Sequence, residues 1–212
     1  MKKFDIITEA DARVLDIGST VELVAGGVVT PLAKDTLAAR RVTVIAAGSQ
    51  DASLAEGLAP VADVRRVTIG NDHSGVALKK AILQHLRGRG LAVLDVGTNS
   101  ADPVDYPDTA GAVAKSVARK EADAGIAIDG AGIGSAIAAN KVRGVRAAMC
   151  LDETTARYSR EHNGANVLCL GATLVPGVEA ALRIVDVWLG TPMREARYIR
   201  RLVKIRRLEE QP

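Results

Sequence analysis

The chain has 212 residues, of which 48% are hydrophobic and 25% charged, and its formal net charge is +3 at pH 7. This length suits one α/β domain with a small additional unit, and no apolar stretch approaches the ~20 residues of a membrane span, which excludes an integral membrane protein. One Trp, one Phe and three Tyr leave the core to aliphatic side chains and alanine. Two cysteines without a secretory signal predict a cytoplasmic protein with free thiols.

The N-terminal segment predicts a small α/β unit followed by a linker. Thr8 with Asp11 is a typical helix start, and the Thr-Pro pair at 30–31 begins a second helix. The segments VELVA and VTVIA each predict a strand. We therefore expect an extension over residues 1–46. Residues 47–65, rich in Ala, Gly, Ser, Asp and Pro, form the expected linker.

The remaining residues, 66–212, predict one α/β domain. Short apolar runs (VTIG, LAVLDVG, GIAID, VRAAMC and NVLCLG) alternate with helical patterns. Such alternation predicts a doubly wound parallel sheet of five strands, in which ligands bind beyond the carboxyl ends of the strands. Polar residues follow the first three strands at 71–73, at 102–108 and at Asp129. We expect them to converge on one crevice.

The run AGIAIDGAGIGSAIAANK places Asp129 and a glycine-rich loop at the end of a buried strand. Gly130, Gly132 and Gly134 have no Cβ, so the loop can turn sharply and bring backbone N–H groups close to a ligand. The N-terminus of the next helix adds unpaired donors, which favours an anion. A plain strand-to-helix turn has the same pattern, so this motif alone leaves both interpretations open.

Four motifs occur in order: NDHSG at 71–75, VDYPD at 104–108, IDGAGIGSAIAANKV at 128–142 and REHNGANVLCLGA at 160–172. Together they resemble the ribose-5-phosphate isomerase B family, which includes galactose-6-phosphate isomerase subunits. The resemblance implies a Rossmann-like subunit and a homodimer or tetramer with its active site at the interface, without metal or organic cofactor. The implied reaction is aldose–ketose isomerisation of a phosphosugar through an enediolate, most simply of ribose 5-phosphate to ribulose 5-phosphate.

The resemblance also implies roles for the residues around the crevice. His73, beside Asp72, would contact the ring or phosphate end of the substrate, and Tyr106 would line the pocket. The loop that contains Gly130, Gly132 and Gly134 would form the anion hole over the enediolate. Asp72 is counted with the expected catalytic residues.

A second group of implied residues lies later in the chain. His162 would protonate the ring oxygen and open the sugar, with Asn163 beside it, and Arg197 and Arg201 would hold the phosphate. Taken singly, His162 could merely end its helix by bonding the last carbonyls, as His73 could cap the next one. Their joint placement in the motifs favours the functional interpretation for both.

The sequence departs from the family pattern at the base. Most members carry a cysteine where this chain has Asp129, and others use a glutamate at the position of Ser135. Carboxylates abstract protons next to carbonyls in other isomerases, so Asp129 is the expected base. Two alternatives stay open: an isomerase of another pentose or hexose phosphate, and a noncatalytic sugar-phosphate-binding or assembly protein.

Both ends of the chain carry further predictions. The C-terminal segment predicts a helix with basic residues on one face, but recognition folds and stacking aromatics are missing, so we expect phosphate capture and not nucleic-acid binding. The pattern ITEADARVLDIGSTVELVAGGVVTPLAKDTLAARRVTVI resembles N-terminal extensions of enzymes packaged in bacterial microcompartments. Residues 1–46 would then dock to shell or cargo proteins, or else simply stabilise an oligomer.

Overall fold

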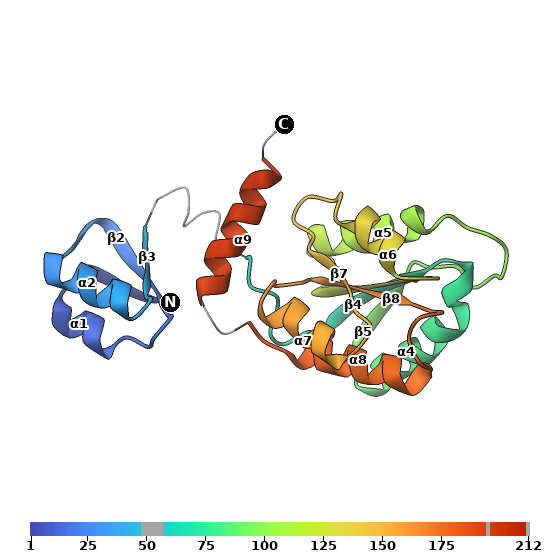
Figure 1. Ribbon diagram of the computed structural model, residues 1–212. Coiled ribbons are helices and arrows are strands. Elements are labelled where there is room, and N and C mark those ends of the chain that lie inside the picture. Colours follow the sequence, from blue (N-terminus) through green and yellow to red (C-terminus); the bar gives the residue numbers. More distant parts are fainter. Residues whose placement is uncertain (48–56, 194–195, 211–212) are drawn as a thin grey trace. The chain divides into compact units, whose positions relative to one another are not determined.

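The computed structural model describes residues 1–47, 57–193 and 196–210, without the side chains of residues 196 and 197. The chain divides into two compact units, one of residues 1–59 with 194–212 and one of residues 60–193 (Figure 1). The middle of the expected linker, residues 48–56, lies outside the described residues. No helix in the described ranges is long and apolar enough to cross a membrane.

The first unit is a parallel sheet of three strands in the order β1-β2-β3, with helices in the connections. Thr8 caps the first helix in a capping box with Asp11, as its sequence predicts. Ile7, Val21 and Leu37 are buried in a core of its own. The elements are β1 (Lys2–Ile7), α1 (Glu9–Val14), β2 (Thr20–Val29), α2 (Pro31–Ala39) and β3 (Thr43–Ala46).

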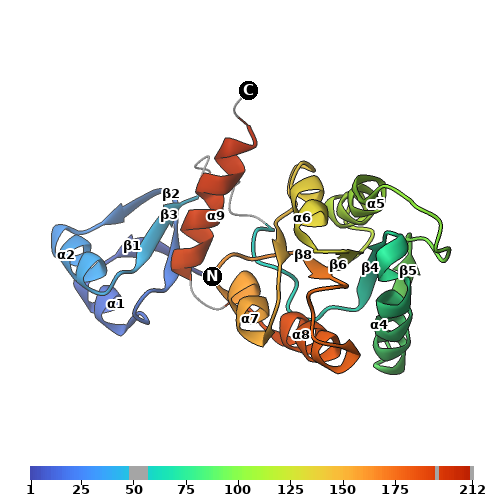
Figure 2. The ribbon, with the colours of Figure 1, turned by 45° about the vertical axis from the view of Figure 1, so that its right-hand side comes forward.

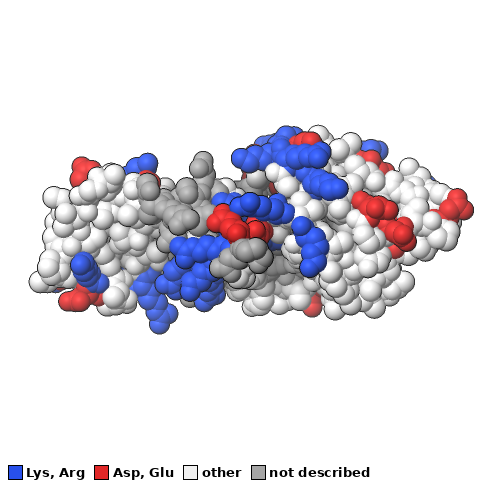
Figure 3. All heavy atoms as spheres, turned by 90° about the horizontal axis from the view of Figure 1, so that it is seen from above, with Lys and Arg blue, Asp and Glu red and all other residues white. Residues whose placement is uncertain are grey.

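The last helix, α9 (Ala196–Leu208), groups with this first unit, whereas the sequence assigned it to the larger domain. Tyr198 and Leu202, one turn apart, are buried, while Arg200, Arg201 and Lys204 are exposed. The helix therefore has the basic face that its sequence predicts. Figure 3 shows Lys and Arg side chains gathered in groups on the face seen from above, with Asp and Glu side chains beside them.

The second unit is the predicted doubly wound fold: five parallel strands in the order β5-β4-β6-β8-β7. Helices α4, α7 and α8 cover one face and α5 and α6 the other (Figure 1, Figure 2). The elements are β4 (Arg66–Asn71), the short helix η1 (His73–Gly75), α4 (Val76–Gly88), β5 (Ala92–Asp95), α5 (Tyr106–Ala118), β6 (Ala124–Asp129), α6 (Ile133–Ala139), β7 (Ala147–Met149), α7 (Glu153–Glu161), β8 (Val167–Gly171) and α8 (Val178–Gly190).

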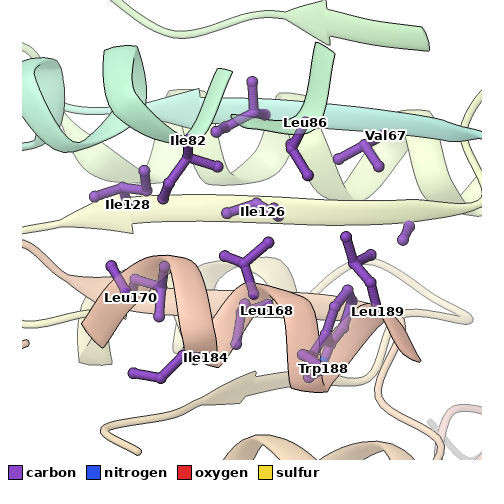
Figure 4. Packing of buried hydrophobic residues seen from close by; sticks show 14 of the residues in the cluster. Val67, Ile82, Leu86, Ile126, Ile128, Leu168, Leu170, Ile184, Trp188 and Leu189 are labelled. Carbon is purple, nitrogen blue, oxygen red and sulfur yellow. The ribbon is translucent and has the colours of Figure 1, made fainter. Parts of the chain in front are cut away.

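Alternate residues of the central strand serve the two faces of the sheet. Ile126 and Ile128 pack against side chains of α4 and α8, and Ala127 faces the smaller cluster on the side of α5 and α6 (Figure 4). Trp188, the only tryptophan, is completely buried in the larger cluster. Burial of a large aliphatic side chain contributes about 1.5 to 3 kcal/mol, so β6 is held firmly from both sides.

The two thiols lie in these two different clusters. The Cys150 amide donates to the carbonyl of Cys169 at 3.1 Å, so the residues are neighbours across β7 and β8. Cys150 nevertheless packs on the α4 and α8 side and Cys169 on the α5 and α6 side. Burial raises the pKa of both thiols. They are core residues, as their apolar surroundings in the sequence predict.

Strand order defines where a ligand can bind. From β4 the chain moves to β5 on one side and then returns to β6 on the other side of β4. The connections after β4 and β6 therefore leave in opposite directions, which opens a crevice at the carboxyl ends of these two strands. Asp72 follows β4, and Asp129 is the last residue of β6.

Candidate active site

The carboxylate of Asp129, at the end of β6, is buried and held by backbone donors of the glycine loop. Its Oδ1 atom accepts the Ala131 N–H at 2.8 Å and also that of Gly132. Its Oδ2 atom accepts the Ser135 N–H at 2.7 Å. Three N–H groups of the expected anion hole thus already bind an anion that belongs to the chain itself.

These bonds also orient the carboxylate. A carboxylate offers about four lone-pair sites, two on each oxygen. Oδ1 uses both of its sites, and Oδ2 uses one for Ser135. Oδ2 of Asp129 therefore keeps one acceptor position that the backbone N–H groups do not fill, and the side chain is 4% exposed.

Two glycines of the loop are required by close packing. Gly132 has φ +77° and a Cβ there would lie 2.9 Å from the Gly171 nitrogen, so the loop rests on the end of β8. A Cβ on Gly134 would lie 2.6 Å from the ring of Tyr106. Tyr106, which is 41% exposed, thus covers the first turn of α6 with its ring, beside the glycine loop.

Asp72 belongs to the neighbouring loop after β4. Its Oδ1 atom accepts the Ser74 N–H at 2.9 Å and the Ser74 hydroxyl at 2.5 Å, and its own N–H donates to the Ile128 carbonyl at 3.0 Å. A Cβ on Gly130 would lie 3.8 Å from Ser74 Oγ. The loops after β4 and β6 therefore touch, and Asp72 caps η1 at their junction.

His73 connects this junction to the loop before α5. Its Nδ1 atom accepts the Val104 N–H at 3.4 Å. A neutral ring that accepts at Nδ1 carries its hydrogen on Nε2, so this edge is a donor for a substrate oxygen. The structure thus brings together the predicted residues of the crevice: Asp72, His73, Tyr106, Asp129, Gly130, Gly132 and Gly134.

Lys79, which the sequence analysis did not single out, binds the loop between β5 and α5. Its side chain is 1% exposed, and Nζ donates to Asp95, to the Thr98 carbonyl and to Asn99 at 2.8 to 3.0 Å. All three ammonium donors are used. The sequence feature that could have identified Lys79 is its position on the apolar face of α4, in line with Ile82 and the other buried residues of that helix.

His162 and Asn163 lie near the amino ends of the strands, at the end of the sheet opposite to Asp129. Helix α7 starts beyond the carboxyl end of β7 and returns to the start of β8, where the Gly125 N–H at the base of β6 donates to the Asn166 carbonyl. The five residues of β8 span about 16 Å at ~3.3 Å per residue. No side chain bridges that distance, so one chain does not bring His162 to Asp129.

The expected phosphate ligands belong to α9, in the first unit. Arg201 is exposed, with its guanidinium 5.6 Å from the Tyr198 ring centre. The Arg197 side chain lies outside the described residues. Their role as phosphate ligands stays a prediction. Within the described ranges, no three His, Cys, Asp or Glu side chains gather as metal ligands would.

A parallel sheet with polar loops at its switch point is the architecture of a ligand-binding α/β enzyme. The sequence model of the Ribose/Galactose Isomerase family matches residues 67–205, and the chain belongs to this family of isomerases. The resemblance indicated by the four motifs is thereby confirmed.

Individual relatives agree. The chain is 44% identical to ribose-5-phosphate isomerase B of Escherichia coli (strain K12), over 69% of this chain and 98% of that protein. A ribose-5-phosphate isomerase B structure from Clostridium thermocellum is 47% identical, with a TM-score of 0.67 over 68% of this chain and 97% of that one. One from Mycoplasma genitalium, with bound ribulose 5-phosphate, is 41% identical, with a TM-score of 0.66 over 69% and 97%.

Proposed function

We propose that the chain interconverts ribose 5-phosphate and ribulose 5-phosphate, with Asp129 as the base. The names of its relatives and the ribulose 5-phosphate bound in one of them support this substrate. The assignment of Asp129 as the base rests on the environment of its carboxylate. This group is buried at the switch point and oriented by three N–H groups, and its Oδ2 atom keeps one acceptor position.

The reaction moves one hydrogen between two carbons. Oδ2 takes the C2 hydrogen of the open aldose as a proton, and the electron pair it leaves forms the C1–C2 double bond. The C1 carbonyl electrons move onto its oxygen, which gives the enediolate. The hydroxyl proton on O2 passes to O1, the carboxylic acid returns its proton to C1, and the C2 oxygen becomes the ketone. No electron leaves the substrate, so no redox cofactor is needed.

Donors that Asp129 does not use stabilise the negative charge. The first turn of a helix leaves N–H groups without intrahelical acceptors, and in α6 these include Ile133 and Gly134. We assign them, with the Nε2–H edge of His73, to the enediolate oxygens. Removal of one such donor in an acyl-transfer enzyme costs about 10² to 10³ in rate, which sets the scale of this contribution.

His162 completes the site from a second copy of the chain. The separation of His162 and Asp129 across the sheet supports a homodimer or tetramer in which each site combines the crevice of one chain with the histidine of another. Ring opening then depends on the partner, and proton transfer depends on the crevice.

The first experiment measures proton exchange. Purified chain is incubated with ribose 5-phosphate in deuterated water, and NMR follows ribulose 5-phosphate and deuterium at the exchanging carbon. We expect turnover that is lost in Asp129→Asn. Turnover that survives in this variant would assign the base to another group. Turnover only with another pentose or hexose phosphate would change the substrate, and binding without any turnover would favour the noncatalytic alternative.

A subunit-mixing experiment tests the shared site. Asp129→Asn and His162→Ala are each inactive alone, but a hybrid dimer holds one site with both residues intact. Random pairing of equal amounts should restore about one quarter of the wild-type rate, because half of the dimers are hybrids with one intact site each. If both residues of a site came from one chain, hybrids confirmed by mass spectrometry would stay inactive.

Residues 1–46 serve assembly and not turnover in this proposal, with a bacterial microcompartment as the expected location. They lie outside the matched region, have their own core, and expose Ile6 and Val28 at 56% each on neighbouring strands. Residues 1–46 fused to a fluorescent protein should form puncta in cells that build such a compartment. An Ile6→Lys, Val28→Lys fusion should stay diffuse, and diffuse fluorescence of the unchanged fusion would contradict the assignment.

A further inference from the structure

The ring of Tyr158 stacks on the ring of His162. Their centroids are 4.6 Å apart and their planes differ by 16°. Tyr158 lies on α7 and His162 at its C-terminal end, four residues later, so both rings lie on one side of the helix. Neither the motifs nor the assigned chemistry of the site accounts for this tyrosine, which is 50% exposed.

The backbone carbonyl of Tyr158 also binds His162 and its neighbour Asn163. This carbonyl accepts the His162 N–H at 3.0 Å and the Asn163 Nδ2 donor at 3.1 Å. One tyrosine therefore contacts both polar residues of the motif, through the ring and through the carbonyl. Tyr158 thus contacts both the backbone and the imidazole of His162.

The helix beneath this tyrosine is rigid. The Ser159 hydroxyl accepts the Trp188 indole N–H at 3.1 Å and donates to the Ala156 carbonyl at 2.8 Å. Arg160 is fully buried, with its guanidinium 4.6 Å from the Trp188 ring centre and hydrogen bonds to the carbonyls of Ala165 and Val61. Because this helix is anchored by buried contacts, the backbone that carries the half-exposed Tyr158 ring is held in place.

We infer that Tyr158 is the positioning residue of His162. This inference rests on the proposed function, in which His162 protonates the sugar ring oxygen. Stacking restricts rotation of the imidazole ring. Tyr158 thereby acts on ring opening and not on proton transfer between carbons.

The two directions of the reaction separate these steps. Ribose 5-phosphate enters as a closed ring, whereas the phosphate on O5 of ribulose 5-phosphate blocks ring closure, so this ketose is already open. Exchange of its C1 hydrogen with deuterated water needs the base but no ring opening. A residue that acts through His162 must therefore slow turnover of ribose 5-phosphate more than it slows this exchange.

The experiment compares Tyr158→Leu, Tyr158→Phe and the exposed neighbour Arg157→Ala as a control. Tyr158→Leu should lower kcat for ribose 5-phosphate by about 3- to 10-fold, the range expected for loss of one aromatic pair, and leave C1 exchange within twofold. Tyr158→Phe keeps the ring and should retain the rate, as should Arg157→Ala. Equal loss in both measurements, or no loss in Tyr158→Leu, would overturn the inference.

NMR gives an independent measurement of the stack. The carbon-bound ring protons of His162 should shift upfield in the wild type and in Tyr158→Phe, relative to Tyr158→Leu, because they lie over an aromatic face. Absence of this shift would overturn the inference and leave the proposed function intact. Absence of wild-type turnover would instead overturn the proposed function, together with the catalytic role of the stack.

Discussion

Replacement of Asp129 by asparagine should destabilise the larger unit as well as remove the base. The substitution keeps the shape of the side chain, and from the sequence alone it is expected to leave the fold largely intact. In the structure, however, the two carboxylate oxygens accept N–H groups of Ala131, Gly132 and Ser135. Asparagine has one acceptor oxygen, and its NH₂ group must then face a backbone N–H.

The magnitude follows from the bonds that change. One of the three charge-assisted hydrogen bonds is lost, and the other two become bonds to a neutral group. A hydrogen bond to a charged group contributes about 1.5 to 3 kcal/mol to stability, and a neutral one contributes about 0.5 to 1.5 kcal/mol. A destabilisation of about 5 kcal/mol results. With a urea m-value of about 2 kcal/mol per molar, the midpoint of unfolding should fall by about 2.5 M.

The assay is urea unfolding followed by tryptophan fluorescence. Trp188 is the only tryptophan and is fully buried in the larger unit, so its emission reports on the unit that contains Asp129. Asp105→Asn is the matched control, because this exposed residue begins α5 without a side-chain capping bond. An Asp129→Asn midpoint within the range of this control would refute the idea that the carboxylate holds the loop. Activity of the variant must be measured well below its midpoint.

Three further predictions use the same unfolding assay or a thiol reagent. Burial acts to raise the pKa of Asp123, but its bonds to Arg66 and to backbone N–H groups outweigh it, and the pKa lies below its ordinary value. Asp123→Asn should therefore cost about 1 to 2 kcal/mol at pH 7 and less at acid pH, because the stabilisation by this carboxylate is lost as the pH falls through its lowered folded-state pKa. An equal cost at both pH values would contradict this. Lys79→Met breaks a buried ion pair and should cost about 3 to 5 kcal/mol, and a midpoint like the wild type's would refute its role. Cys150 and Cys169 should react with an aromatic disulfide only after unfolding, and rapid labelling of the native chain would contradict their burial.

Local patterns were enough to predict the elements of the larger unit. The helix of α4 and the strand of β6 follow from apolar periodicity, and the glycine loop follows from its composition. The order β5-β4-β6-β8-β7 was not predictable in this way, because it depends on which strands pair across the whole domain. Strand β1 was missed, since Lys2, Lys3 and Asp5 interrupt its apolar character and its pairing with β2 decides its conformation.

The candidate site was predictable as a set of residues but not as a geometry. The motifs identify Asp129, while its bonds to the loop depend on the positive φ of Gly132, which sequence spacing does not reveal. The stack of Tyr158 on His162 was predictable only as helical spacing, because residues four apart often lie side by side without ring contact.

The position of His162 follows from the direction of α7 once the strands are known to be parallel. A helix that leaves the carboxyl end of one strand must return to the amino end of the next, so a residue at its C-terminus lies away from the crevice. Each half of the proposed site is fixed separately, Asp129 by the loop of β6 and His162 by the Tyr158 ring. Because neither half of the proposed site depends on the other within a chain, we expect association of two chains to complete it and so to link catalysis to assembly.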